Sequence, residues 1–492
     1  MVPYIAVAAA LLLVVVFAIK NHGKGKLPPS PPSLPFVGHL HFVGQLPHRS
    51  LDDLHRRYGS DGGLMFIRLG PTGALVVSSA AAAADLFKHH DLAFASRPPN
   101  CTAERLFYGD RNISFAPYGD GWRRAKKLAV VHLLSTRRAA SSAPARAAEA
   151  ADLVARARRA AEAGQAVPLR PLLYGYTNGV ITRVAAGGSG ETAERWRKMM
   201  ADTTELLVGF QWVDRLPAAV GWAVRRVTGL DKKLDDMAEE SDRLLTEIVT
   251  AHDDEKADGD EDDFVDVLLR LRRQDAGGLE LTEDHIKAII KDVMAAATDT
   301  SFVTLEWIMA ELMRNTRVMA KLQDEIRQVT GAKPTVTEDL SKMDYLKAVV
   351  KEVLRLHPPA PLLVPHLSTA PATVQGYDIP ARTIAFVNVW AIGRDPAAWE
   401  APAEFRPERF VGTAVDFRGN DHKLIPFGAG RRMCPGISLA LLGLEMAVAS
   451  LLYHFDWELP DGVDAPALDI AEAPGLTTPP MEPLWLIPKI KN

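Results

Sequence analysis

The spacing of hydrophobic positions along the chain separates strand-like regions from helix-like regions. Leu64–Leu69 and Ala74–Ser78 are short apolar runs on either side of a Gly-Pro-Thr-Gly turn signal, which predicts two paired strands. From residue 80 to residue 330, apolar side chains recur with helical spacing and prolines are few. This region is therefore predicted to be mainly helical, and it includes a helix from about His285 to Arg314.

The pattern changes again in the last third of the chain. Strand-like texture returns between Pro361 and Asn388, with a predicted turn at 376–380 and a strand at 383–387, and a helix is predicted over 437–453. The acidic run from Asp253 to Asp263 lacks the ordered ligand spacing of a metal site, so it predicts a solvated connection. We expect one large, helix-dominated domain with a smaller β portion.

The chain begins with an uncharged apolar run over residues 2–19, which would be about 27 Å long as a helix and nearly as long as a bilayer core is thick. A cleaved secretory signal is the alternative. Positive charge precedes the apolar run in such signals, whereas here Lys20, Lys24 and Lys26 follow it. This order favours a retained single-pass anchor, with the rest of the protein on the cytosolic side.

A proline-rich stretch follows the apolar run. Five prolines lie between Leu27 and Pro35, a composition that excludes a helix and predicts a semi-rigid spacer. The sequence therefore divides into an anchor at 2–19, a Lys- and Pro-rich linker and hinge at 20–35, and one domain at 36–492.

Composition narrows the class of protein. Hydrophobic residues make up 47% of the chain and charged residues 24%, which is typical of globular proteins and excludes wholesale disorder. The net charge of −4 argues against nucleic acid as a partner. Two cysteines cannot form a disulfide framework, so we expect the domain to lie in a reducing compartment.

The strongest chemical signal surrounds the second cysteine, in Phe427-Gly-Ala-Gly-Arg-Arg-Met-Cys-Pro-Gly436. Glycines allow backbone N–H groups to point at the Cys434 sulfur, and Arg431 and Arg432 would help to stabilise its thiolate. The start of the following helix would also favour negative charge there. The alternative is an ordinary buried cysteine in a glycine turn.

This decapeptide resembles the heme-binding loop of the cytochromes P-450, which are heme-thiolate monooxygenases. Further motifs resemble that family in the same order along the chain. They are Trp122–Lys127, Ala296–Ser301, Lys351–Pro359 and Phe405–Phe410.

The resemblance implies the cytochrome P-450 fold, mainly α with a smaller β portion, behind one N-terminal transmembrane helix. It implies heme b as cofactor, with Cys434 as the axial ligand of the iron. Phe427, Arg432 and Gly436 would belong to the same heme-binding loop. Glu352, Arg355 and Arg409 would form a buried network that braces this loop, the alternative being a surface ion pair of Glu352 and Arg355.

Further roles follow from the resemblance. Asp299 and Thr300 would deliver protons to bound O2, the alternative being a Thr300 hydroxyl bonded only to its own helix. Ala297 stands where the family usually has glycine, which narrows the oxygen groove. The heme propionates would be bound by Trp122, Lys126, His366 and Arg432, although arginine is more frequent in the family at positions 126 and 366.

Resemblance also indicates the partners and the substrate class. Arg123, Arg124 and Lys127 would face an NADPH-dependent reductase that supplies electrons. The segments His39–His41, Ala116–Tyr118 and Trp390–Asp395 resemble plant A-type, family-71-like members, and 34–41 resembles grass enzymes that hydroxylate indole-derived benzoxazinoid precursors. Substrate-facing positions, carried over from the fold, would be Phe107, Phe210, Ala297, Leu362, Val364 and Leu476.

We therefore expect a monooxygenase anchored in the endoplasmic reticulum membrane that hydroxylates a small lipophilic metabolite, of indole, other aromatic or terpenoid type. A heme-thiolate isomerase or dehydratase that works without reductase would share the cysteine loop, but such enzymes often lack the acid-Thr pair. A non-catalytic heme protein is the remaining alternative, and it would need no proton relay.

Overall fold

The computed structural model describes residues 26–188, 191–206, 212–216, 218–254, 263–274, 281–460, 462–465 and 468–491. The predicted anchor at 2–19, the first part of the predicted linker, Phe210 and most of the acidic run from Asp253 to Asp263 lie outside these residues.

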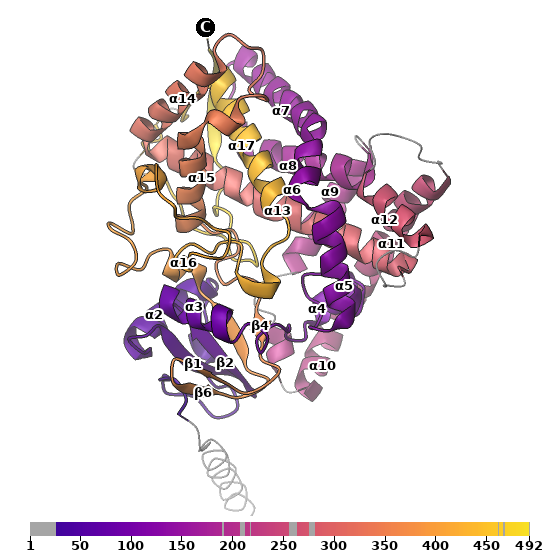
Figure 1. Cartoon of the computed structure of the whole chain (residues 1–492), viewed down its shortest axis with the longest axis vertical. Coiled ribbons are helices and arrows are strands. Elements are labelled where there is room, and N and C mark those ends of the chain that lie inside the picture. Colours follow the sequence, from indigo (N-terminus) through magenta and orange to yellow (C-terminus); the bar gives the residue numbers. More distant parts are fainter. Residues whose placement is uncertain are drawn as a thin grey trace, which may run out of the picture.

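Helices make up most of the described chain, and a small mixed sheet lies at one end of the molecule (Figure 1). The helices are α2 (Pro47–Tyr58), α3 (Ala80–His89), α4 (Cys101–Leu106), α5 (Asp120–Leu128), α6 (Thr136–Ser141), α7 (Ala143–Ala163), α8 (Leu169–Ala186), α9 (Glu191–Leu206), α10 (Ala218–Val227), α11 (Leu230–Asp254), α12 (Phe264–Arg273), α13 (Glu283–Arg314), α14 (Thr316–Thr330), α15 (Asp344–Leu356), α16 (Val389–Ile392) and α17 (Ile437–His454), with the short helices η6 (Pro407–Phe410) and η7 (Gly430–Arg432) before α17.

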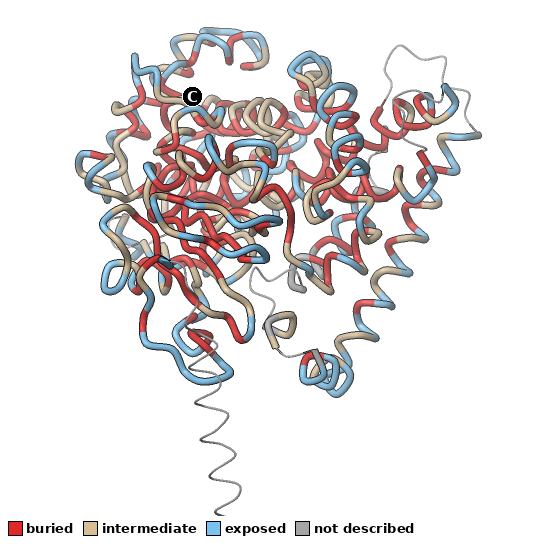
Figure 2. The backbone as a smooth tube through the Cα atoms, turned by 60° about the horizontal axis from the view of Figure 1, so that its bottom comes forward, coloured by how far each residue is buried: buried red, intermediate tan, exposed pale blue. Residues whose placement is uncertain are grey.

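The long helix α13 runs through the centre of the helical region, where it packs against α8, α11, α12, α15 and α17. It begins at a capping residue, because the Thr282 side chain accepts a hydrogen bond from the His285 N–H. Glu283 and Asp284 occupy its first turn, where the helix dipole favours acidic side chains. Most of the residues that follow are buried, so α13 is a core helix on nearly all sides. Figure 2 shows that buried residues gather in the interior of the molecule.

The main sheet combines strands from distant parts of the chain. Its order is β1-β2-β7-β4, with β2 and β7 parallel and the other pairs antiparallel. The strands of the three sheets are β1 (Leu64–Leu69), β2 (Thr72–Val77), β3 (Val167–Pro168), β4 (His366–Leu367), β5 (Ala372–Val374), β6 (Tyr377–Ile379), β7 (Ile384–Val387), β8 (Phe455–Glu458) and β9 (Trp485–Ile490).

The expectation of a mainly helical fold with a smaller β portion is confirmed. The predicted turn at 376–380 is shorter than expected, because Gln375 and Gly376 alone make the turn between β5 and β6, both with positive φ. Among the described helices, α17 is the one long and apolar enough to cross a membrane, but 56% of it is buried inside the protein. We therefore regard α17 as a core helix.

The described part of the proline-rich segment lies along the main sheet. The Phe66 N–H of β1 donates to the carbonyl of Pro29 at 2.9 Å, and the His39 Nε2 lies 2.8 Å from the carbonyl of Pro31. The Lys26 N–H lies 3.2 Å from Asp378 in β6. From residue 26 onward, the chain is thus hydrogen-bonded to the sheet end of the molecule.

Candidate active site

Cys434 lies in a tight loop that joins η7 to α17. Its N–H donates to the carbonyl of Phe427 at 2.9 Å, and the Gly436 N–H points at the Cys434 sulfur at 3.4 Å. Gly430 has a φ of +65°, and a Cβ at this position would stand 2.2 Å from a carboxylate oxygen of Asp91. Both the backbone angle and this contact require glycine, so the loop conformation depends on it.

The protein around Cys434 favours a neutral thiol. Burial raises the pKa of Cys434, while the Gly436 N–H and the Lys126 ammonium act in the opposite direction. Arg431, which was expected to support the thiolate, instead pairs with Asp91 through its Nε at 2.9 Å and is exposed. Coordination to a metal cation stabilises a buried thiolate, so this sulfur suits a metal ligand better than a free nucleophile.

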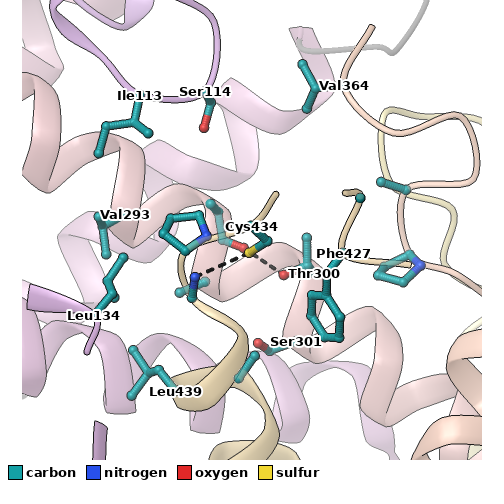
Figure 3. A pocket seen from close by; sticks show the side chains of 18 of the residues that line it. Ile113, Ser114, Leu134, Val293, Thr300, Ser301, Val364, Phe427, Cys434 and Leu439 are labelled. Carbon is teal, nitrogen blue, oxygen red and sulfur yellow. Dashed lines mark hydrogen bonds between the residues drawn. The ribbon is translucent and has the colours of Figure 1, made fainter. Parts of the chain in front are cut away.

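A cavity of about 260 Å³ adjoins the Cys434 sulfur. In Figure 3, Cys434 and Phe427 reach this cavity from the loop before α17, whereas Thr300 and Ser301 reach it from α13. Most of its other walls are apolar, as is typical of sites for small organic molecules. The thiol therefore faces a helix across a largely apolar space.

The four side chains expected at the propionates all line this cavity. The Trp122 Nε1 donates to the carbonyl of Ile113 at 2.9 Å, and the Arg432 guanidinium lies over the Trp122 ring at 3.9 Å from its centre. Lys126 donates to the carbonyl of Met433 at 2.5 Å, and burial lowers the pKa of Lys126 to about 8. The helix α5 and the cysteine loop thus supply cationic groups on the same cavity.

His366 differs from Lys126 and Arg432 because its surroundings favour the uncharged form. Its Nδ1 lies 2.9 Å from the carbonyl of Phe94, which can only accept, so Nδ1 holds the proton. Burial and the nearby Arg97 lower the pKa of His366 to about 3. A carboxylate beside the ring would raise the pKa of His366. A bound propionate would therefore itself favour the protonated ring that pairs with it.

Arg97 also lines the cavity and was missed in the sequence. Its guanidinium is buried and donates to the carbonyls of Ser114, Val364 and Pro365 at 2.5–2.9 Å. Burial lowers the pKa of Arg97 well below its usual value. No local motif marks Arg97 in the sequence. The carbonyl groups that it binds lie as far as 268 positions away along the chain.

The charges around the cavity do not balance. Among the described residues that line it, Asp292 is the only carboxylate, and its oxygen accepts the N–H groups of Ile113 and Ser114 at 2.8 and 2.9 Å. Burial raises the pKa of Asp292, which disfavours the charged form of its carboxyl group. Arg97, Lys126 and Arg432 thus outnumber it, as expected for a site that receives two further carboxylates, and the residues present fit a heme.

Asp299 and Thr300 lie on different faces of α13. Thr300 lines the cavity, and its hydroxyl donates to the carbonyl of Ala296 at 2.8 Å, the bond that the alternative interpretation predicted. Asp299 is not among the described residues that line the cavity, and its charge contributes to raising the pKa of Tyr174 in α8. Neighbouring residues of a helix point in different directions. The two side chains therefore diverge, and of the two only Thr300 faces the cavity.

The Glu352, Arg355 and Arg409 side chains meet in the interior. The Glu352 carboxylate accepts two hydrogen bonds from Arg355, at 2.7 and 2.8 Å, and one from Arg409 at 3.0 Å. The Glu352 and Arg355 side chains are fully buried, which excludes the surface ion pair. Arg355 also donates to the carbonyls of Gly393 and Pro402, so the network joins α15 to the segments between β7 and the cysteine loop.

The positions expected to face substrate are not all at the cavity. Ala297 and Val364 line it, whereas Leu362 packs against the core of the main sheet. Phe107 is buried against the Phe115 ring and near the Lys291 ammonium. Leu476 is half-buried in the loop before β9, and Phe210 lies outside the described residues.

A buried thiol suited to a metal, opposite a helix and beside an excess of cations, fits the site of a heme-thiolate protein. The family model for cytochrome P450 matches residues 28–487, and the chain belongs to this family. It is therefore an oxidoreductase of the monooxygenase type.

Similar proteins come mostly from plants. "Cytochrome P450 71AP13" of Prunus mume is 43% identical, with 95% of this chain and 91% of that protein covered. "4-hydroxyphenylacetaldehyde oxime monooxygenase" of Sorghum bicolor is 42% identical over 96% of this chain and 90% of its own length. "(+)-menthofuran synthase" of Mentha piperita is 40% identical, with coverages of 94% and 92%.

Solved structures support the same fold. A zebra fish cytochrome P450 determined with abiraterone superimposes with a TM-score of 0.77 at 25% identity, over 91% of this chain and all of that chain. The resemblance to the cytochromes P-450, and to the family-71 plant members in particular, is confirmed.

Proposed function

We propose that this protein is a membrane-anchored monooxygenase that hydroxylates a small lipophilic specialised metabolite, using O2 and electrons that a reductase takes from NADPH. The observation that carries the proposal is the position of the Cys434 sulfur on an apolar cavity that α13 closes from the other side with Thr300. A heme held through this sulfur would supply oxygen activation, because thiolate ligation favours O–O cleavage.

The residues around the cavity divide the remaining work. Cys434 would bind the iron, with the N–H of Gly436 holding the sulfur in place. Arg97, Trp122, Lys126 and Arg432 would bind the propionates, because charge-assisted bonds to carboxylates are strong and these donors line the cavity. His366 joins them when a neighbouring carboxylate draws a proton onto its ring.

Thr300 controls protons on the substrate side. Its hydroxyl hydrogen is donated to Ala296, so the oxygen lone pairs remain free to accept a hydrogen bond from a water in the cavity. The hydroxyl would therefore orient such a water on the α13 side of the cavity. Asp299 lies one position away on the face toward Tyr174, where it exchanges protons with water from outside the cavity.

The substrate is small and apolar. Leu134, Val180, Ile181, Val293 and Val364 are among the cavity walls, so the polar groups of a substrate have few partners there. The names of two relatives include (+)-menthofuran and 4-hydroxyphenylacetaldehyde oxime. Indole-derived, other aromatic and terpenoid compounds are therefore the classes to screen.

Electrons enter through the exposed face of α5. Trp122 and Lys126 face inward, whereas Arg123, Arg124 and Lys127 are exposed on the same helix. This charge suits an acidic reductase surface. Replacing Arg124 and Lys127 with glutamate should slow reduction by the reductase without changing heme content, whereas Arg317→Glu on α14, distant from α5 in Figure 1, should leave the rate unchanged.

The apolar run at 2–19 anchors the protein in the endoplasmic reticulum membrane, with the domain in the cytosol. Its length and the lysines that follow it support this orientation. A chain lacking residues 2–19 should move from the membrane fraction to the soluble fraction and keep its heme spectrum. A truncated protein that stays with intact membranes would contradict the anchor.

The reaction is tested with purified protein, a plant reductase, NADPH and ¹⁸O2, using a panel of indoles, phenolics and terpenoids. The proposal predicts a product that contains one ¹⁸O atom and forms only when reductase is present. A product that forms without reductase and carries no ¹⁸O from O2 would instead identify an isomerase or dehydratase. Spectral substrate binding without any product would favour a non-catalytic heme protein.

A further inference from the structure

The segment before β9 folds back on itself as a narrow loop, which we call the C-terminal hairpin (471–481). The Ala473 N–H donates to Pro479 at 2.8 Å and the Met481 N–H donates to Ala471 at 2.7 Å. Leu476, one of the positions expected to face substrate, lies at its tip, and no described residue of the hairpin is among those that line the cavity. The hairpin reaches the cavity wall through other contacts.

The tip of the C-terminal hairpin is tied to the wall of the cavity. The Thr478 N–H donates to the carbonyl of Pro359 at 3.0 Å, and Pro359 lines the cavity. The Thr478 carbonyl accepts the indole N–H of Trp307 at 2.8 Å. Thr478 and Trp307 are both buried, so water cannot replace this bond.

Trp307 is itself held in one orientation. Its ring stacks on the His357 imidazole with centroids 4.0 Å apart and planes at 8°. The His357 Nε2 in turn lies 2.7 Å from a Glu311 oxygen, on the same helix as Trp307. His357 precedes Pro358 and Pro359 in the chain, so Trp307 contacts the base of the cavity wall as well as the hairpin.

A second pair of side chains holds the returning limb of the hairpin. The Arg170 Nε lies 3.1 Å from both Glu306 oxygens, and Arg170 also donates to the carbonyl of Pro480. The fully buried Glu306 carboxylate accepts a backbone bond from Leu484. Adjacent residues of α13, Glu306 and Trp307, thus fix two points of the same loop.

We propose that Trp307, together with Glu306 and Arg170, is a positioning residue that fixes the C-terminal hairpin against Pro359 in the wall of the cavity. Trp307 follows Thr300 by about two helical turns, so one rigid helix sets both the oxygen side and the hairpin. The proposal deepens the proposed function, because it assigns the residues that shape the substrate side of the same site.

The test uses Trp307→Phe, which retains a ring to stack on His357 and removes the indole N–H. Trp457→Phe is the matched control, since Trp457 is also buried and donates its Nε1 to a backbone carbonyl, that of Leu451, outside the hairpin. Two iron-binding probes, imidazole and 4-phenylimidazole, are titrated into the ferric holoenzyme. They differ by one phenyl ring. The ratio of their dissociation constants therefore measures how well the cavity wall accommodates that ring, because the contribution of the iron bond is common to both.

Trp307→Phe should weaken 4-phenylimidazole binding about three- to tenfold, the equivalent of one lost hydrogen bond, with imidazole binding and heme content unchanged. Amide hydrogen exchange in 471–481 should accelerate in this variant alone. Arg170→Lys, which cannot reach both Glu306 and Pro480, should act in the same direction. An unchanged ratio and unchanged exchange in Trp307→Phe, or equal changes in Trp457→Phe, would overturn the proposal.

The exchange measurement separates this proposal from the proposed function. If the wild-type chain bound neither azole, the heme-thiolate assignment would fail. Faster exchange in 471–481 would still support the positioning role of Trp307, and identical exchange in both variants would still refute it.

Discussion

At the scale of single residues, Cys434 and Thr300 face the same cavity but are held in different ways. The sulfur is pointed by backbone N–H geometry in a glycine-dependent loop, whereas the hydroxyl is bonded to its own helix. Local motifs in the sequence were sufficient to predict that both residues belong to the candidate site. The conformation of each is set mainly by its neighbours in the chain. Arg97 and Asp292 could not be predicted in this way, since their partners lie far away in sequence.

Thr300→Ala should uncouple electron consumption from product formation. Without the Thr300 hydroxyl, the proposed water loses its partner at this position of α13, so more NADPH should end as hydrogen peroxide. Peroxide released per NADPH oxidised is the measurement. Thr304→Ala is the control, because Thr304 makes an equivalent bond to the Thr300 carbonyl at 2.7 Å and is buried away from the cavity. Equal coupling in Thr300→Ala and the wild type would contradict the role of the hydroxyl.

At the scale of elements, helices and strands with strong periodicity were predicted well. The strand pair at 64–77 and the helices α13 and α17 lie within a few residues of their expected bounds. The sequence was less informative where a few residues form a turn, as at Gln375 and Gly376, and where a loop acquires its shape from distant partners, as in the C-terminal hairpin. The substrate-facing role expected of Leu362 stays a prediction, and its side chain packs against the core of the main sheet.

The network of Glu352, Arg355 and Arg409 predicts a strong effect of one substitution. Arg355→Ala leaves the buried Glu352 without its main partner, which costs about 3–5 kcal/mol, and it frees the segments that Arg355 holds. Heme incorporation should be abolished, as measured by heme content per chain. Arg406→Ala should retain heme, because the Arg406 side chain pairs with the exposed Glu400. Normal heme content in Arg355→Ala would refute the bracing role.

Glu472 predicts a pH-dependent link between α2 and the C-terminal hairpin. His48 and Arg49 lower the pKa of the buried Glu472 to about 2. Because this pKa is depressed on folding, the stabilisation is complete above about pH 4.5 and is lost as the pH falls toward 2. Glu472→Gln should cost about 2–3 kcal/mol at pH 7.

Thermal melting as a function of pH measures this effect. The difference between wild type and Glu472→Gln should be largest near neutral pH and should shrink below about pH 4. A difference that stayed constant from pH 7 to pH 3 would show that the Glu472 charge does not stabilise the fold.

At the scale of the whole molecule, the fold brings together the Cys434 thiol, the cations Arg97, Lys126 and Arg432, and the helix α13. These groups come from four separate parts of the chain. Membership of the cytochrome P450 family and the helical architecture follow from motifs spread along the sequence. The exact set of residues that line the cavity does not follow from these motifs, because its walls come from segments as far apart as α5, α13 and α17.

The ligand of the iron is tested most directly by the absorption spectrum of the reduced, carbon monoxide-bound holoenzyme. Trans ligation by the Cys434 thiolate predicts the strongly red-shifted Soret band of a heme-thiolate protein, and this band should disappear in Cys434→Ser. A Soret band of histidine-ligated heme in the wild type, or an unchanged red-shifted band in Cys434→Ser, would contradict the account.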